Sequence, residues 1–264
     1  MAVMPNRPAK PLPLTGATVV VTRPTAAAAT LKRRAAALGA AVVALPGLSL
    51  RGADDPRAAA RALRAARTAD AAIFVSPAAV RHAALLAPLA FSRRTTVFAV
   101  GAATARALRR RGISAQHPQR QDSEGLLALP ALARVRGKRV ALIGAPGGRE
   151  ALPRALRRRG AAVERVDVYR RAPARLDGRH LRVLEAARPP LLVLVSSAEI
   201  LDNLQRALPA AAFTRLAGSE IVVGSARLAI LAQAAGCRRV HVARSAESAA
   251  LLAGAISALA QHRL

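Results

Sequence analysis

An internal repeat constrains this chain more than any other feature of its sequence. Residues 19–39 (VVVTRPTAAAATLKRRAAALG) and 140–160 (VALIGAPGGREALPRALRRRG) share one plan: apolar strand, turn, basic amphipathic helix and glycine. Sliding the chain by 121 positions (161 − 40 = 121) also lays Ala40-Ala41-Val42 over Ala161-Ala162-Val163. A repeat this long indicates duplicated domains, because the units of solenoid proteins run to roughly 20–50 residues.

The repeat also predicts the fold class. Near-continuous apolar strands, such as 71–75 and 191–195, alternate with helical segments, a pattern typical of parallel sheets covered on both faces. Two equivalent stretches without a helical period, Pro46–Arg51 and Asp167–Ala172, are predicted to be the passages between domains. We therefore predict an α/β protein with two similar doubly wound parallel-sheet domains.

The predicted division is a flexible tail at 1–14, a first domain of 15–47 and 172–264, a second domain of 52–166, and connectors at 46–52 and 166–173. Helices are predicted at Ala26–Leu38, Pro56–Arg67, Ala78–Leu86, Ala103–Arg111, around Ser123–Gly125, and at Glu150–Arg159, Asp177–Ala187, Ala198–Ala207, Ala226–Ala235 and Ala246–His262.

The charge of the chain leaves two interpretations open. The formal net charge is +28, and 39 of the 42 basic residues are arginine (42 − 3 lysines = 39). Arginine and alanine enrichment together can reflect compositional drift, with guanidinium groups on solvated helix faces, or it can serve an anionic partner. Aromatic residues make up only 2% of the chain, so the stacking platforms of single-strand-binding proteins are missing. A small anionic ligand is therefore favoured over nucleic acid.

Several other classes of protein are disfavoured. The first 14 residues hold four prolines and no apolar segment, and no apolar run reaches the roughly 18 residues of a membrane span. We predict a cytoplasmic protein without a membrane partner. The single cysteine, Cys237, excludes an internal disulfide and is predicted to be a small buried hydrophobe. The five histidines show no metal-ligand spacing, so no metal is predicted.

Candidate binding residues follow from the predicted sheets, because ligands of such folds lie beyond the C-terminal ends of the strands. These positions hold Arg23, Ser76, Thr104, the turn Gly147-Gly148-Arg149, Ser196, Ser197 and Ser225. Hydroxyls and N–H groups at helix starts favour anions. Ordinary N-capping is the favoured interpretation of any one serine, and their repetition in both halves makes anion binding an equal alternative for the set. The glycine turns match neither a P-loop nor G-x-G-x-x-G, so no nucleotide is predicted.

Tyr169, the only tyrosine, is the one side chain with plausible acid chemistry. A phenol stays protonated near neutral pH and can donate to a departing oxygen. The alternative is an aromatic that packs at the passage between domains. No convincing Ser-His-Asp or paired-carboxylate constellation competes with it.

Taken together, the segments resemble the uroporphyrinogen-III synthase family. The matching pieces, in family order, are VVVTRP at 19–24, AAIFVSPAAV at 71–80, FAVGAATARAL at 98–108, SEGLL at 123–127, GGREALPRALRRRGAAVERVDVYRR at 147–171, LVSSAEILDNL at 194–204 and VVGSARLA at 222–229. The resemblance implies two α/β domains joined by a two-stranded connector, a monomer, and no cofactor. It also implies cyclisation of hydroxymethylbilane, a linear tetrapyrrole with eight carboxylates, with loss of water and inversion of ring D.

The resemblance also implies roles for individual residues. Tyr169 matches the tyrosine proposed to assist the leaving hydroxyl, and Thr104 a threonine of the ligand cleft. Ser76, Ser197 and the turn 147–149 match ligand-facing positions. Where some members have paired threonines, Gly224–Ala229 offers only Ser225. Two other functions stay open at this point: a non-catalytic two-domain module for an anionic ligand, and a basic nucleic-acid-binding protein.

Overall fold

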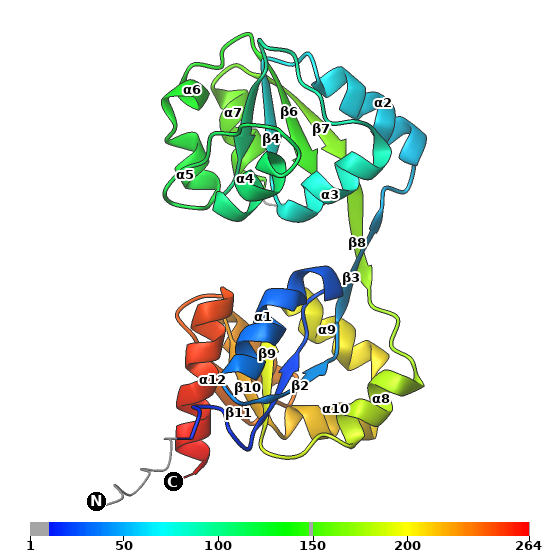
Figure 1. The fold of residues 1–264 in the computed structure, drawn as a ribbon, viewed down its shortest axis with the longest axis vertical. Helices are drawn as coiled ribbons and strands as arrows, with labels where there is room; N and C mark the ends of the chain where they lie inside the picture. Colours follow the sequence, from blue (N-terminus) through cyan, green and yellow to red (C-terminus); the bar gives the residue numbers. More distant parts are fainter. Residues whose placement is uncertain (1–10, 148–149, 264) are drawn as a thin grey trace, which may run out of the picture. The chain divides into compact units, whose positions relative to one another are not determined.

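The chain folds into two compact units. The computed structural model describes residues 11–147 and 150–263. One unit comprises residues 1–49 and 172–264, and the other comprises 50–171 (Figure 1). The chain therefore leaves the first unit early, completes the second, and returns to finish the first.

The first unit is a parallel five-stranded sheet in the order β11-β10-β9-β1-β2. Side chains from α1 and α12 form the core on one face of this sheet, while α8, α9 and α10 lie on its other side (Figure 1). The elements are β1 (Thr18–Val21), α1 (Thr25–Ala37), β2 (Ala41–Ala44), α8 (Gly178–Glu185), β9 (Leu191–Val195), α9 (Ala198–Ala207), α10 (Ala210–Ala217), β10 (Glu220–Val223), α11 (Ala226–Ala234), β11 (Arg239–Val242) and α12 (Ser248–His262).

The second unit repeats this plan with a parallel four-stranded sheet in the order β5-β4-β6-β7. A parallel bridge between Phe98 and Gln116 extends the sheet beyond β5. The elements are α2 (Pro56–Ala66), β4 (Ala71–Phe74), α3 (Pro77–Leu86), β5 (Thr96–Ala99), α4 (Ala102–Arg109), α5 (Ser123–Leu127), α6 (Pro130–Ala133), β6 (Arg139–Gly144), α7 (Ala151–Arg158) and β7 (Ala162–Asp167).

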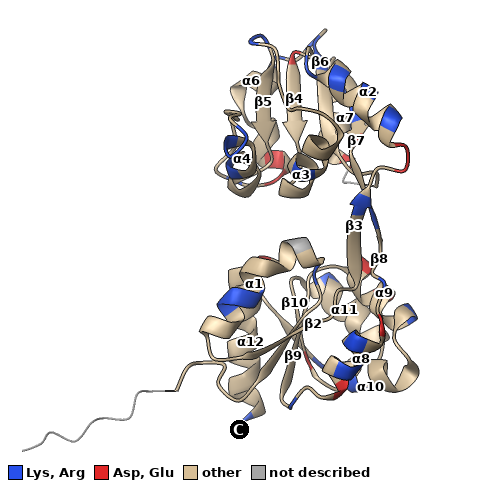
Figure 2. Ribbon diagram, turned by 45° about the vertical axis from the view of Figure 1, so that its right-hand side comes forward, with Lys and Arg blue, Asp and Glu red and all other residues tan. Residues whose placement is uncertain are grey.

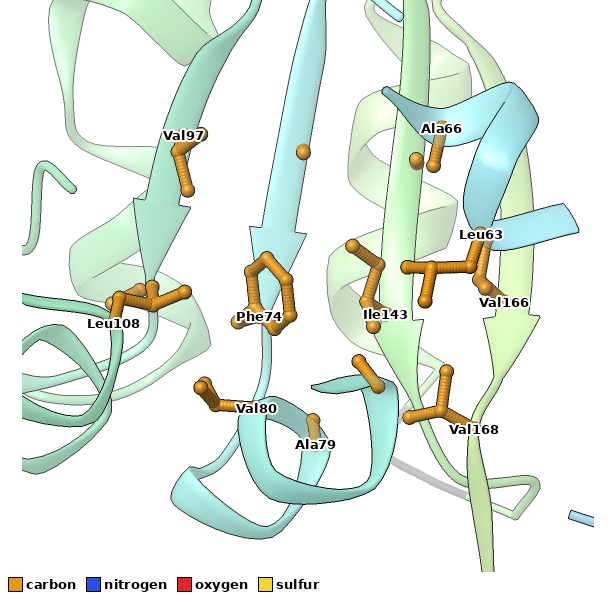
Figure 3. Close-up of a cluster of buried hydrophobic side chains, with 14 of the residues drawn as sticks. Leu63, Ala66, Phe74, Ala79, Val80, Val97, Leu108, Ile143, Val166 and Val168 are labelled. Carbon is orange, nitrogen blue, oxygen red and sulfur yellow. The ribbon is translucent and has the colours of Figure 1, made fainter. Parts of the chain in front are cut away.

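Alternating side chains of the second sheet build two separate cores. Ala72, Phe74 and Ile143 point to one face, where they pack against α2, α3 and α4 (Figure 3). The neighbouring residues Ile73 and Leu142 point to the other face, against α5, α6 and α7. Strands buried on both faces explain why the sequence shows continuous apolar runs instead of alternation. The predicted fold class is confirmed.

Two further strands lie where the chain passes between the units. β3 (Leu48–Gly52) and β8 (Tyr169–Pro173) pair with each other in a two-stranded sheet. The chain changes unit after Ser49 and after Arg171, inside the stretches for which the sequence predicts connectors. Tyr169 is the first residue of β8 and belongs to the second unit, which ends at Arg171. It lies two residues after β7, the last strand of the second unit's parallel sheet.

Most predicted elements are present, with three exceptions. The sequence did not predict α6 or α10, each of which begins directly at or after a proline, Pro130 and Pro209. The last helix was predicted from Ala246 but begins at Ser248. Residues 244–247 form an irregular turn instead, because this segment packs closely against Gly224 and accepts a hydrogen bond from Arg23.

Candidate active site

Tyr169 and Ser76 are brought together at the C-terminal edge of the second sheet. The Tyr169 hydroxyl lies 3.3 Å from the Ser76 Oγ, and either group can donate this hydrogen bond. Ser76 is the N-cap of α3, and its Oγ also accepts from the Ala79 N–H at 3.0 Å. The phenol therefore faces the positive end of a helix dipole, which favours negative charge. Tyr169 itself is only 4% exposed.

A residue that the sequence did not single out completes this contact. The His82 ring stacks on the Tyr169 ring, with centroids 5.3 Å apart and planes inclined by 23°. Burial lowers the pKa of His82, and the positive charge of Arg81 lowers it further. The imidazole is therefore neutral near pH 7. No signal in the sequence connects His82 with a tyrosine 87 residues away (169 − 82 = 87).

Tyr169 lines a pocket of about 320 Å³ within the second unit. Two arginines of its lining are already paired with carboxylates. Arg170 Nε lies 2.5 Å from Asp54, and Arg165 lies 2.7 Å from Glu150. A carboxylate ligand at these guanidinium groups would therefore compete with acidic side chains of the protein.

The predicted serines of the first unit lie at helix starts. Ser197 caps α9 and accepts from the Ile200 N–H at 3.3 Å, while Ser225 caps α11 and accepts from the Leu228 N–H at 3.3 Å. Ser196 is half-buried and lies between the end of β9 at Val195 and the N-cap Ser197. Ser197 and Ser225 thus have the N-capping role that is the alternative to anion binding, and each hydroxyl still has a proton to donate.

The structure places Arg23 against its own unit. The guanidinium donates to the Ala246 carbonyl and, at 3.1 Å, to the Ser248 Oγ. Burial lowers the pKa of Arg23, an effect that the negative charge of Glu247 partly opposes. Arg23 therefore fixes the turn before α12, and the predicted contact with a ligand has to share this guanidinium.

The other predicted residues differ in exposure. Thr104 is only 3% exposed on α4, whereas Gly147 is exposed, with a φ of +72° that favours glycine. Gly148 and Arg149 lie outside the described residues. Within residues 11–147 and 150–263, no cluster of three or more histidine, cysteine or acidic residues is arranged to hold a metal ion.

Basic residues are distributed over both units. Figure 2 shows lysine and arginine on α1 and α8 of the first unit and on α2 and α4 of the second. Among the described helices, none combines the length and the apolar character needed to cross a membrane.

These features define a protein of two duplicated α/β units with hydroxyls at helix starts and one buried tyrosine at the start of β8. A profile of the family described as uroporphyrinogen-III synthase HemD matches residues 29–253. The chain therefore belongs to the uroporphyrinogen-III synthase family, as the resemblance indicated.

Individual relatives agree with this assignment. The uroporphyrinogen-III synthase of Escherichia coli K12 is 37% identical over 158 residues, and that of Salmonella typhimurium LT2 is 35% identical over the same length. Each alignment covers 59% of this chain and 64% of the relative, so the chain spans just under two thirds of the curated relatives it matches.

Solved structures show the same fold. A uroporphyrinogen III synthase mutant from the extremely thermophilic bacterium Thermus thermophilus matches with a TM-score of 0.54 at 20% identity, covering 93% of this chain and 100% of that one. The enzyme from Helicobacter pylori 26695 matches with a TM-score of 0.58 at 15% identity, covering 91% and 98%.

Proposed function

We propose that this protein is a uroporphyrinogen-III synthase that cyclises hydroxymethylbilane to uroporphyrinogen III. The observation that carries the proposal is the position of Tyr169, whose hydroxyl meets Ser76 at the start of α3 and which lines a pocket in the second unit. Membership of the family supports the same activity. The reaction is a cyclising hydro-lyase reaction that needs no cofactor.

In the proposed first step, the Tyr169 hydroxyl gives its proton to the terminal hydroxyl of the substrate as the C–O bond breaks. Water leaves, and the electron pair of the pyrrole nitrogen forms the azafulvene in its N-protonated, cationic form, which balances the negative charge on the Tyr169 oxygen. The Ser76 Oγ already accepts from the Ala79 N–H, so its own proton can be donated to the phenolate oxygen. This hydrogen bond and the dipole of α3 stabilise the charge that develops on Tyr169.

In the later steps, the substituted carbon of ring D attacks the azafulvene to give a spiro intermediate. Fragmentation and a second closure leave ring D inverted, and the phenolate recovers the proton that the product releases. The azafulvene also closes without help to the uninverted isomer, so the protein must hold the geometry of its ligand. Positioning is therefore the larger part of the proposed catalysis.

Substrate carboxylates are proposed to meet the strand-end residues of the two units. Ser197 and Ser225 combine a hydroxyl with the N-terminus of a helix in the first unit. Thr104, Ser196, Arg23 and the turn 147–149 complete the proposed binding set. The pocket beside Tyr169, at about 320 Å³, lies at the lower end of the range for small-molecule sites and suits a part of the tetrapyrrole.

The first experiment supplies freshly generated hydroxymethylbilane to the purified protein, oxidises the products and separates the porphyrin isomers by chromatography. A dominant type III product is expected. If only type I appears, as in a reaction without protein, the enzyme proposal fails, and a non-catalytic module for an anionic ligand becomes the leading account.

The second experiment compares Tyr169→Phe with the unmodified protein. Loss of the acid is expected to lower turnover by more than tenfold while circular dichroism stays unchanged. Ser257→Ala is the matched control, because it removes a hydroxyl from the exposed side of α12. Unchanged turnover in Tyr169→Phe would return the tyrosine to a packing role.

We also propose that the protein acts as a cytoplasmic monomer, without a nucleic-acid or membrane partner. The shortage of aromatic residues supports the first exclusion, because the stacking used for single strands is missing. Light scattering after size exclusion measures the oligomeric state. An affinity for oligonucleotides that falls steeply with salt and ignores tetrapyrrole competitors would favour the nucleic-acid alternative.

A further inference from the structure

His82 differs from the other histidines in what it contacts. His117, His180, His241 and His262 each hydrogen-bond through a ring nitrogen. Among the described residues, His82 has no such partner, and its contact is the stacked Tyr169 ring. Hydrogen bonding therefore does not explain the position of this half-buried imidazole, whose contact is made through its ring face.

The Tyr169 side chain is touched at two places by one helix. Ser76, at the start of α3, meets the hydroxyl, and His82, six residues later on α3, meets the ring (82 − 76 = 6). The hydroxyl contact of 3.3 Å is long for an O–H···O bond and holds the phenol only weakly. The stack adds the contact that fixes the plane of the ring.

We propose that His82 is a positioning residue that holds the Tyr169 ring so that its hydroxyl stays at Ser76. This inference rests on the proposed function, because it places His82 behind the residue that gives up the proton. His82 touches the acid and not the reacting atoms. Of Ser76, His82 and Tyr169, only His82 is selected neither by a position at a strand end nor by the family resemblance.

The charge state of His82 decides how it acts. Burial and the nearby Arg81 lower the pKa of His82, so a neutral aromatic ring faces the phenol near pH 7. A neutral ring positions by stacking and needs no ionisable nitrogen for that purpose. His82→Phe keeps a flat ring and is expected to work, whereas His82→Leu keeps apolar bulk without a ring and is expected to fail.

The test measures kcat and KM for His82→Phe and His82→Leu in the full chain. We expect His82→Leu to lose roughly fivefold or more in kcat with KM nearly unchanged, because small displacements of a catalytic group are costly. His82→Phe is expected to stay within about twofold of the unmodified kcat, since the stack is retained. Leu85→Ala is the matched control, because Leu85 is exposed on the same helix.

A spectroscopic readout reports on the ring itself. The chain has one tyrosine and no tryptophan, so its near-ultraviolet circular dichroism in the tyrosine band comes from Tyr169. We expect the unmodified protein and His82→Phe to show a strong tyrosine band and His82→Leu a weakened one. Far-ultraviolet circular dichroism and urea unfolding check that each variant is folded.

Each of four outcomes overturns the inference in whole or in part. The stack has no role if His82→Leu keeps both kcat and the tyrosine band. The imidazole acts through its nitrogens, and not as a positioning ring, if His82→Phe loses as much kcat as His82→Leu. A type I product from the unmodified protein removes the proposed function, and the catalytic part of the inference falls with it. A type III product with a fully active His82→Leu removes only the inference.

Discussion

The two units share a scaffold but differ at the point where a strand leads out of the sheet. The strands of the first unit, in the order β11-β10-β9-β1-β2, correspond one by one to elements of the second. β11 corresponds to the bridge at Gln116, and β10, β9, β1 and β2 correspond to β5, β4, β6 and β7. A shift of 121 places Tyr169 over Leu48 (169 − 121 = 48) and His82 over Asn203 (82 + 121 = 203). The stacked ring pair of the second unit therefore has no aromatic counterpart in the first.

The residue before Leu48 explains why the first unit needs no aromatic ring at the position of Tyr169. Gly47, which corresponds to Val168, packs directly on α9, where an added Cβ would lie 2.5 Å from the Ile200 carbonyl oxygen. In the second unit, Val168 and Tyr169 fill the equivalent space with side chains. The two units thus agree in where helices start and strands end, while a few side chains at those places differ between them.

The largest expected effect concerns the cores. Phe74 is fully buried and meets Phe91 edge to face at 5.9 Å, whereas Val195 stands at the corresponding place in the first unit (74 + 121 = 195). Phe74→Ala is expected to lower the free energy of unfolding by about 4 kcal/mol and Val195→Ala by about 2 kcal/mol. Urea unfolding followed by circular dichroism measures both. Equal costs would show that the two cores depend on these positions alike.

The second-largest expected effect concerns the close contact between Gly47 and α9 in the first unit. Gly47→Ala introduces a methyl group into contact with the Ile200 backbone and the Leu204 side chain, and should cost about 3 kcal/mol. Gly52→Ala is the control, because nothing lies within 4 Å of its added Cβ. The same unfolding experiment separates them. A Gly47→Ala protein as stable as the control would mean that the segment between β2 and β3 moves away from α9 easily.

An ionic cluster at the start of β10 gives the third difference. Glu220 is 3% exposed and accepts hydrogen bonds from His241 at 2.7 Å and His262 at 3.0 Å, and Arg239 lies 2.6 Å away. Burial alone would raise the pKa of Glu220, but the two hydrogen bonds and the Arg239 charge outweigh it and leave the pKa below its ordinary value of 4.5. Thr96 begins the corresponding strand β5 of the second unit.

The sign of the pH dependence follows from this lowered pKa. The folded state binds the Glu220 proton more weakly than the unfolded state, so the stabilisation is complete above pH 4.5 and is lost as the pH falls through the folded pKa. Glu220→Gln is expected to cost about 2 kcal/mol at pH 7, and progressively less on acidification. Urea unfolding at several pH values measures this, and a cost independent of pH would contradict the ionic account.

The fold was predictable because the repeat marks its boundaries twice. Serine or glycine after several of the apolar runs indicated strand ends and helix starts, including the N-caps at Ser76, Ser197 and Ser225. The helix α10 was missed because the second unit has only an irregular stretch, 87–95, between the corresponding elements. Its sequence, AAAFTRLA, lies behind a proline and shows no strong capping signal.

The candidate site was predictable only in part. Strand-end geometry selects residues by their place along the chain, so it names Ser76, whereas Tyr169 is named as the only tyrosine and by the resemblance. Contacts between distant segments stayed hidden, namely the stack of His82 on Tyr169, the Arg23 hydrogen bonds to residues 246–248, and the Glu220 cluster. Each depends on which faces of two elements meet, and local periodicity carries no information about that.

The smallest expected effect compares the two capping serines. Ser76→Ala and Ser197→Ala each remove one N-cap and should each cost about 1 kcal/mol of stability. Their spectroscopic effects should differ, because only Ser76 meets the Tyr169 hydroxyl. The tyrosine band is expected to change in Ser76→Ala and to persist in Ser197→Ala. If both variants left the band unchanged, the stack alone would hold Tyr169, and the hydroxyl contact would matter only for the charge that develops in the proposed reaction.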